Sequence, residues 1–395
     1  MKATPHAQKQ TVLVAALTLV ALSLLYLIYV LPTWWVSLTA PNYPKEAFPD
    51  GVRIEFHMNG VFNGCKKVEK KEISESVALD CVHEMDTINH YVGMYPIAAG
   101  GPIERGFSQF LITFLGVMLL GFMCIKPKIR MGILALGFGL VAVWMYLTLY
   151  GEDGFKLENA GYVEALVTSL DQEAGGEGGG ESSSGGGIVE MLRKSLEASG
   201  VKIDMPGERK NEVVDENLSR KDRLIDQLRQ TYERDHAKGL VSEPWNGSTF
   251  QIMAWHYGKS LGRYFNNQEE IRPMVKHLKL AINVVFWGLI GAMLLLIWGA
   301  RKNGGVLYWL LVIVPMALPV FFVIDYSAWL WWYGHTLNSM GAFSVKPFMP
   351  TVFGDGKVAQ FATHSYPDKG FFVMLLLAAV LAVAALIRRK AFRGA

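Results

Sequence analysis

The sequence predicts a mainly α-helical, six-span inner-membrane protein with polar insertions on the periplasmic side, the first of which contains some β-strand. Three observations predict this class. Of the 395 residues, 51% are apolar and 18% are charged; the apolar residues gather in six long runs, and short basic segments lie at alternate ends of these runs. Such a composition fits either one large globular protein or a set of membrane spans, and the runs favour the spans.

Six runs each hold about 17 to 21 residues without a lysine or arginine, which is enough to cross the hydrocarbon layer at about 1.5 Å per residue. Pro315 and Pro319 predict a kink in the fifth run. The first run continues into Pro32 without an A-x-A-like cleavage site, so we interpret it as an uncleaved anchor. The runs are Thr11–Leu31, Phe107–Ile125, Met131–Tyr150, Ile282–Ala300, Val306–Tyr326 and Phe371–Ile387.

Basic residues predict the orientation of the spans. Eleven lysines and arginines, and no acidic residue, lie in the short segments 1–9, 126–130, 301–302 and 388–393. Because Lys and Arg are retained on the cytoplasmic side, these segments and both termini are expected in the cytoplasm, and the chain is a multi-pass protein in contact with membrane lipid. The rest of the chain carries more acidic than basic residues, which excludes a basic surface for nucleic acid.

The spans divide the chain into alternating membrane and water-exposed parts. In the first exposed part, Val52–Met58 alternates apolar and polar residues, which predicts a half-buried strand. The glycine- and serine-rich segment 175–187 has nothing apolar to bury and is expected to be a flexible linker. The predicted parts are an anchor (1–31), a periplasmic Cys/His/Met module (32–106), a transmembrane hairpin (107–150), a periplasmic insertion (151–279), a second hairpin (280–332), a periplasmic loop (333–369) and a last helix with a basic tail (370–395).

Two further helices are expected in the large insertion, at 188–198 and 213–238. In the second, one stripe is apolar and dense charge lies opposite, so this helix is expected to cover a partner surface or another part of the chain. The stripe is Leu224, Ile225, Leu228 and Tyr232.

The stretch Asp80–Ile97, DCVHEMDTINHYVGMYPI, combines a thiol, two imidazoles and two thioethers. On a helix capped by Asp80, the side chains of His83, His90 and Met94 fall within about 40° of one another. His90 and Met94 are one turn apart, roughly 6 Å along the axis, and could hold one ion; His83 lies about 10 Å from His90 and could not share it without a break. Imidazole and thioether donors make copper the first candidate metal.

Each of these ligands has a structural alternative. A polar helix whose His90 caps a loop and whose Met94 packs against neighbours would show the same pattern without any ion. Cys65 and Cys81 lie in a part of the chain expected outside the cytoplasm, where a disulfide would stabilise the fold by about 3 kcal/mol. The alternative is a thiolate pair that contributes to a Cu(I) site with His83.

The last exposed loop also contains histidine and methionine residues that could bind copper. His335 and Met340 are candidates to complete a copper site with His90 and Met94. Alternatively, His335 is a hydrogen-bonding residue of the aromatic belt at the membrane surface and Met340 belongs to the core. Asp325 lies close to the outer end of the fifth span, where an acid needs a partner and often marks function.

Three segments carry a resemblance to a family. WWVSLTAPNYP (34–44), TINHYVGMYPI (87–97) and KPFMPTVFGDGKVAQFATHSYP (346–367) resemble segments of a group of bacterial polytopic membrane proteins. These are similar to proteins encoded beside the maturation factor and transporter parts of the nitrous oxide reductase system, which handle copper. The resemblance covers both ends of the chain but not its glycine-rich middle, and it implies a copper-accessory role without naming ligands.

The leading hypothesis is therefore an inner-membrane accessory protein that presents His and Met ligands to the periplasm for copper handling or for maturation of a copper enzyme. Its rival is a metal-free membrane scaffold or docking subunit of a periplasmic or transport complex. Both imply a protein partner. The sequence contains no Walker A loop, no G-x-S-x-G, no HExxH and no CxxCH, and it shows no recognisable acid-base or nucleophile set, so enzymatic activity is not the expectation.

Overall fold

The structure is a computed structural model that describes residues 5–66, 80–174, 219–358 and 360–393. It divides the chain into two compact units, one formed by residues 1–162 with 246–395 and the other by residues 163–245. The predicted linker at 175–187 and the predicted helix at 188–198 lie outside the described residues.

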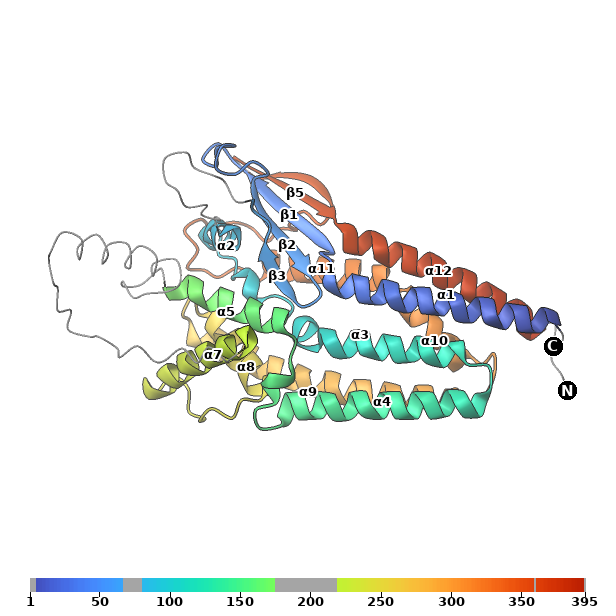
Figure 1. The fold of residues 1–395 in the computed structure, drawn as a ribbon. Helices are drawn as coiled ribbons and strands as arrows, with labels where there is room; N and C mark the ends of the chain where they lie inside the picture. Colours follow the sequence, from blue (N-terminus) through green and yellow to red (C-terminus); the bar gives the residue numbers. More distant parts are fainter. Residues whose placement is uncertain (1–4, 67–79, 175–218, 359, 394–395) are drawn as a thin grey trace, which may run out of the picture. The chain divides into compact units, whose positions relative to one another are not determined.

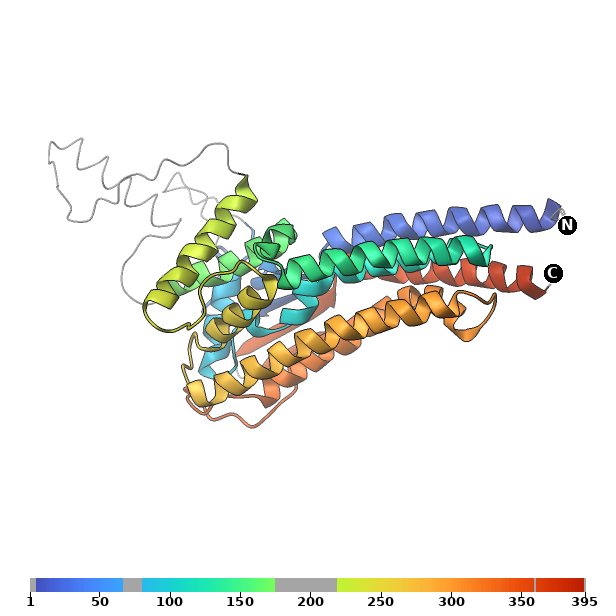
Figure 2. The same ribbon diagram turned by 90° about the horizontal axis from the view of Figure 1, so that it is seen from below.

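Among the described residues, five helices are long and apolar enough to cross a membrane, and a bent helix pair makes six if it counts as one span. This arrangement is compatible with a multi-pass membrane protein. Both described ends of the chain lie at the same end of the helices (Figures 1 and 2). The helices are α1 (Pro5–Val30), α3 (Pro102–Met123), α4 (Pro127–Tyr150), α9 (Gln268–Gly299) and α12 (Lys369–Arg393), with the pair α10 (Val306–Met316) and α11 (Leu318–His335).

The predicted proline kink is confirmed. Helices α10 and α11 meet at a bend of 62°, with Pro315 in the last turn of α10 and Pro319 at the start of α11. Proline removes a backbone donor and crowds the preceding turn, which accounts for the break here. Helix α11 then continues to His335, so the belt residues Trp329, Trp331, Trp332 and Tyr333 lie inside this helix.

Helix α9 begins at Gln268, earlier than the sequence predicted. The Asn267 side chain caps it by accepting from the Glu269 N–H at 3.2 Å, and two glutamates lie in its first turn. Both features stabilise a helix N-terminus. Residues 268–279 therefore belong to this helix, where we had expected the end of an insertion.

A five-stranded antiparallel sheet lies beside the ends of α1 and α12 that are remote from the termini (Figure 1). Its strand order is β3-β2-β1-β5-β4. The strand predicted at 52–58 is confirmed as β2, whereas β1, β3, β4 and β5 were not predicted. The strands are β1 (Trp34–Thr39), β2 (Val52–His57), β3 (Gly60–Asn63), β4 (Gly354–Val358) and β5 (Phe361–Pro367).

The two central strands continue directly from two packed helices. Strand β1 follows α1 after three residues, and β5 ends two residues before α12 begins; α1 and α12 pack side by side (Figure 1). The paired strands match Trp34 with Pro367 and Ser37 with His364. At the crossing between helix and strand, the Gly370 N–H donates to the Pro32 carbonyl at 2.7 Å. The strand pair and the helix pair therefore form one continuous element.

One face of the sheet packs against helix α2 (Cys81–Tyr91). The apolar cluster between them consists of Leu38, Val52 and Ile54 from the sheet with Cys81, Val82, Met85 and Ile97. Alternation along β1 and β2 places these sheet residues on one face and Trp35, Arg53 and Glu55 on the other.

Two of the basic residues that predicted the orientation are buried at the end of the first unit where the termini lie. Arg130 is 0% exposed and Arg388 is 1% exposed. Arg130 donates to the carbonyl of Ala300 at 3.0 Å, and Arg388 donates to the carbonyl of Met123 at 2.8 Å. These carbonyls belong to the C-terminal ends of α9 and α3, where a cation is favoured by unsatisfied carbonyls and by the helix dipole.

The second unit contains most of α5 (Ala160–Ala174) and α7 (Arg220–Ala237). Ser219 caps α7 by accepting from the Asp222 N–H at 3.2 Å. Ile225, Leu228 and Tyr232 are buried, as the predicted apolar stripe requires.

Candidate functional site

Helix α2 begins where the sequence predicted. The Asp80 carboxylate accepts hydrogen bonds from the N–H groups of Val82 and His83, each at 3.1 Å, which is the geometry of an N-cap. Met85 points into the core against the sheet. The cap fixes which residues of this stretch face the sheet and which face away from it.

The end of α2 differs from the spacing on which the His90–Met94 pair depends. The helix stops at Tyr91, and Gly93 adopts φ +85°. Its N–H donates to the His90 carbonyl at 2.9 Å, while the Met94 N–H donates to the Asn89 carbonyl at 3.2 Å. This is a Schellman motif, which needs a residue in the left-handed conformation. Met94 therefore lies in the following loop, 8% exposed, and not one helical turn above His90.

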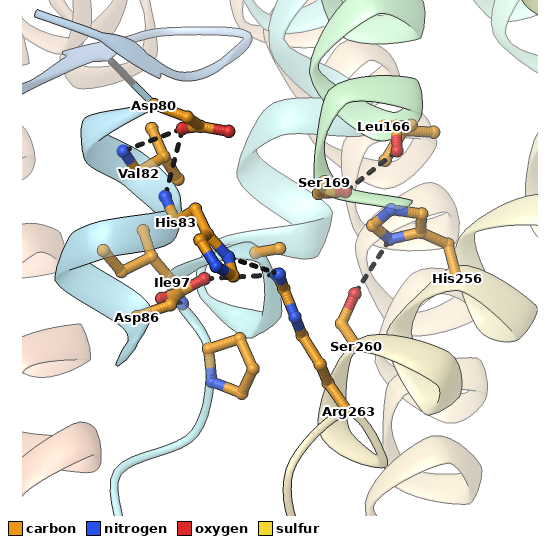
Figure 3. Close-up of polar contacts among 12 residues, drawn as sticks. Asp80, Val82, His83, Asp86, Ile97, Leu166, Ser169, His256, Ser260 and Arg263 are labelled. Atoms are coloured by element: carbon orange, nitrogen blue, oxygen red, sulfur yellow. Dashed lines mark hydrogen bonds and ion pairs between the residues drawn. The ribbon is translucent and has the colours of Figure 1, made fainter. Parts of the chain in front are cut away.

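His83 faces a buried ion pair (Figure 3). Arg263, from the segment between α8 (Thr249–Leu261) and α9, donates from Nη2 to Nδ1 of His83 at 3.0 Å. Its Nη1 lies 3.5 Å from Oδ2 of Asp86, with the two side chains 5% and 0% exposed. Because a guanidinium only donates, Nδ1 of His83 must accept, and the lone pair by which this nitrogen would bind a metal is occupied.

Asp86 is an unusual carboxylate. Its Oδ1 accepts from the Ile97 N–H at 2.7 Å, and its Oδ2 makes no hydrogen bond of ordinary length within the described chain. Burial raises the pKa of Asp86 to about 7, against the opposing effects of the Ile97 N–H and of Arg263. The carboxyl group is therefore partly protonated near neutral pH.

His90 is enclosed by aromatic rings. Its ring stacks on Tyr264 at 4.5 Å with an interplanar angle of 13°, and lies 4.3 Å from the ring of Tyr91. Its Nδ1 is buried, and no hydrogen bond from the described residues reaches it. His90 is thus a packed imidazole with one unsatisfied nitrogen.

The two cysteines form the disulfide that the sequence allowed. Cys65 and Cys81 are joined, with their Cα atoms 6.0 Å apart. Both sulfurs are occupied in this arrangement, so Cys81 is not the thiolate ligand that the alternative required. Cys124 is a free cysteine.

The last loop places His335 and Met340 in different surroundings from those that a shared site needs. His335 is the final residue of α11; its Nδ1 lies 2.9 Å from the carbonyl of Trp331, and its ring stacks on the Trp331 ring at 4.4 Å. This matches the alternative of a hydrogen-bonding residue in the aromatic belt. Met340 is 65% exposed, so its assignment to the core was wrong.

The last loop nevertheless meets the end of α2. The Asn338 N–H donates to the Gly93 carbonyl at 2.8 Å, and the Phe343 N–H donates to the Tyr91 carbonyl at 2.9 Å. The Asn338 side chain and the Tyr95 hydroxyl both donate to Oε2 of Glu270, at 3.1 and 3.0 Å. We call this meeting of the two loops and the start of α9 the Gly93 junction.

Asp325 has an acidic neighbour. It lies close to Glu104 in the first turn of α3, whose Oε1 accepts from the indole N–H of Trp329 at 3.2 Å. The sequence predicted that Asp325 needs a partner, and the partner is a second acid and not a base. A functional role for Asp325 stays a prediction.

These positions do not fit a preassembled copper site. Within the described residues, no three His, Cys, Asp or Glu side chains are grouped so that they could hold one ion. Of the proposed ligands, His83 bonds Arg263, Cys81 is in a disulfide, and His335 and Met340 lie at the surface. One donor, Nδ1 of His90, is buried and unsatisfied.

The second face of the sheet carries a cluster that the sequence did not reveal. Trp35 of β1 pairs across the sheet with Tyr366 of β5, and their rings are 5.4 Å apart. The guanidinium of Arg53 lies 4.5 Å above the Trp35 ring and bonds Glu55 and Asp368, each at 3.2 Å. We call Trp35, Arg53 and Tyr366 the aromatic face.

Comparisons with known proteins place the chain in no group. No family model, curated protein or solved structure matches it. What the chain does must therefore be argued from its own side chains.

An exposed apolar residue adjoins the aromatic face. Phe353 is 66% exposed, and its ring lies 5.7 Å from that of Tyr366. The loop that leads to it exposes several other large apolar side chains. They are Met340, Phe343, Val345 and Met349.

A row of three polar side chains crosses the same face. The Thr39 hydroxyl lies 3.4 Å from Nε2 of His364, whose Nδ1 lies 2.6 Å from Oδ1 of Asp355. Hydrogen bonds from His364 and Tyr366 lower the pKa of the Asp355 carboxyl. The order hydroxyl, imidazole, carboxylate is that of a nucleophile with its base, but the Asp355 side chain is 66% exposed, and catalysis of this kind needs a water-excluding site. We interpret the row as a cross-strand contact that stiffens the sheet.

Proposed function

We propose that the protein is a membrane-anchored docking subunit whose aromatic face binds a partner protein. The observation that carries this proposal is the cluster of Trp35, Arg53 and Tyr366 on strands that continue from α1 and α12. Tryptophan, tyrosine and arginine dominate the energetics of protein interfaces because each combines a large contact area with a polar group. If the positive-inside rule sets the orientation, this face lies in the periplasm.

The anchoring supports the same proposal. The partner would bind to strands that hydrogen-bond to each other and extend from two packed helices, so little conformational freedom would be lost on binding. Phe353, exposed beside Tyr366, extends the apolar part of the surface. Glu55 and Asp368 hold the Arg53 guanidinium over the Trp35 ring and supply polar groups around the aromatic centre.

Substitutions on this face are expected to release the partner. Trp35→Ala removes a central ring, and Phe353→Glu places a charge on a side chain that is 66% exposed. Each should reduce the amount of partner isolated with the protein from mildly solubilised membranes by about tenfold or more, because loss of one interface hot spot costs at least about 2 kcal/mol. Trp287→Ala is the matched control, since Trp287 is 66% exposed on α9. Undiminished recovery from both face variants would contradict the proposal.

Copper handling is the second candidate function, and the unsatisfied Nδ1 of His90 favours it. This nitrogen could donate an electron pair to a metal ion, and it lies beside the loop that contains Met94. Coordination of one ion by both residues would require the loop after Gly93 to rearrange, since the helix does not extend to Met94.

The two candidates predict different results for two substitutions. If copper binds here, His90→Ala and Met94→Leu should both lower the copper content of the purified protein, and the double variant should be strongly non-additive. If the residues only pack, Met94→Leu, which preserves volume, should be silent, and His90→Ala should act only through protein abundance. Metal analysis by mass spectrometry of the two variants and the wild type separates these outcomes. Our docking proposal expects copper well below one ion per chain in all three.

A further inference from the structure

A cavity of about 280 Å³ lies between the end of α1 and the turn that joins β2 to β3. It is lined by Tyr29 and Val30 of the helix and by His57, Asn59 and Phe62 of the hairpin. Val30 is 46% exposed and is the last residue of a candidate span. If α1 spans the membrane, the cavity lies at the depth of lipid headgroups, on the side where the sheet lies.

Three aromatic rings form much of the wall. The rings of His57 and Phe62 are 5.0 Å apart at an interplanar angle of 81°, and Tyr29 lines the cavity from the helix. The faces of such rings carry negative potential and attract organic cations. Burial lowers the pKa of His57, so its ring is neutral at pH 7 and does not repel a cation there.

Carboxylates outnumber cations around these rings. Glu55 and Asp368 both lie close enough to His57 to favour positive charge there, and the two share a single guanidinium, that of Arg53. Glu158, 2% exposed, also acts electrostatically on the Tyr29 hydroxyl. The electrostatic surroundings thus favour a cation over an anion.

One buried polar atom of a lining residue is unsatisfied within the described chain. The Tyr29 hydroxyl makes no hydrogen bond of ordinary length, although Ser108 and Glu158 both act on it. The Asn59 side chain is held at the cavity because its amide nitrogen donates to Oδ1 of Asn159 at 3.0 Å. Buried polar groups are rarely left without partners unless a ligand or water supplies them.

We propose that this cavity binds the ammonium group of an amine-bearing ligand, with aromatic rings around the cation and the Tyr29 hydroxyl and Asn59 amide as polar contacts. A volume of 280 Å³ lies just below the range of about 300–1,000 Å³ that accommodates drug-sized ligands, so it suits a headgroup or a small free amine. The two sources of this chemistry are phosphatidylethanolamine in the membrane and a soluble amine such as ethanolamine.

Native mass spectrometry of the full-length protein in detergent can test this proposal. The protein is titrated with phosphatidylethanolamine and, separately, with phosphatidylglycerol. It should retain one molecule of phosphatidylethanolamine at least fivefold more than it retains phosphatidylglycerol. Tyr29→Leu and Phe62→Leu, which replace rings by aliphatic groups, should each abolish the preference. Tyr26→Leu is the matched control, because Tyr26 lies one turn earlier in α1 and is 66% exposed.

Two further experiments distinguish a lipid headgroup from a soluble amine and control for misfolding of the variants. Displacement of the bound lipid by millimolar ethanolamine would assign the site to soluble amines, and retention of the lipid would assign it to the membrane; both outcomes support the ammonium chemistry. His57→Lys, placed on a half-exposed strand, should eliminate phosphatidylethanolamine binding while the melting temperature changes little. Equal retention of the two lipids by the wild type, or an unchanged preference in the folded His57→Lys and Tyr29→Leu variants, would overturn the proposal.

Discussion

Gly93→Ala is expected to destabilise the protein by about 2–5 kcal/mol, the sum of a conformational cost and a steric cost. Gly93 has φ +85°, a conformation that costs other residues about 1–2 kcal/mol. A Cβ atom there would also lie 2.5 Å from the carbonyl oxygen of Asn338, so the last loop would have to move, at a further cost of about 1–3 kcal/mol.

Thermal unfolding in detergent measures this effect, with Gly132→Ala as the control. Gly132 lies within α4, and a Cβ atom there would meet nothing within 4 Å, so its substitution should be neutral or slightly stabilising. Gly93→Ala should lower the melting temperature by several degrees and make the segment 336–353 more sensitive to proteolysis. Equal stability of the two variants would show that the Gly93 junction does not hold the loops together.

Asp86 is expected to make the protein less stable as the pH rises from about 4 to about 7. Burial raises its pKa to about 7 in the folded protein from an ordinary value of 3.8. Between these values the folded state binds a proton that the unfolded state releases, so the free energy of unfolding falls as the pH rises. At about 1.4 kcal/mol per pH unit, the change across this window is on the order of 4 kcal/mol.

Asp86→Asn should remove this pH dependence. The amide keeps an oxygen for the Ile97 N–H and carries no charge, so the variant should be more stable than the wild type at pH 8 and similar to it at about pH 4. The charged and titratable groups around Asp86 are Arg263, Asp80, His83, Tyr264 and Tyr333. Glu84→Gln, on the same helix, is the control and should leave the pH profile unchanged. An Asp86→Asn variant that melts lower than the wild type at every pH would show that attraction to Arg263 outweighs burial.

The features that were predictable from the sequence are local ones. Apolar runs indicate the helices of the first unit, prolines indicate the bend between α10 and α11, and alternation indicates β2. Each of these patterns is contained in about 20 consecutive residues. The Asp80 cap is equally local. The number of spans and their orientation in the membrane remain predictions.

The features that were missed depend on contacts between distant segments. Strand β1 is short, and its pairing partner β5 lies more than 300 residues later; no signal within either segment identifies the other. The aromatic face consequently could not be recognised, because Trp35 and Tyr366 become neighbours only when the two strands pair. Arg263 was missed for the same reason, as a single arginine between two helices.

The copper ligands illustrate the limit of spacing arguments. His90 and Met94 would share one face only if the helix continued past Gly93, and one glycine in the left-handed conformation prevents this. The prediction that His83 is a copper ligand did not include Arg263, which lies 180 residues away in the sequence and donates a hydrogen bond to the imidazole. Residue types at helical spacing therefore identified the region but not the contacts that each side chain makes.

Site-specific photo-crosslinking at position 366 tests the docking proposal most directly. A photoreactive phenylalanine analogue in place of Tyr366 preserves the aromatic ring, and irradiation of intact cells should yield one discrete species larger than the 43.9 kDa chain. Combination with Trp35→Ala should abolish this species, and the same probe at Tyr146, 56% exposed on α4, should not produce it. A product that persists without Trp35, or identical products from positions 366 and 146, would contradict a specific partner at the aromatic face.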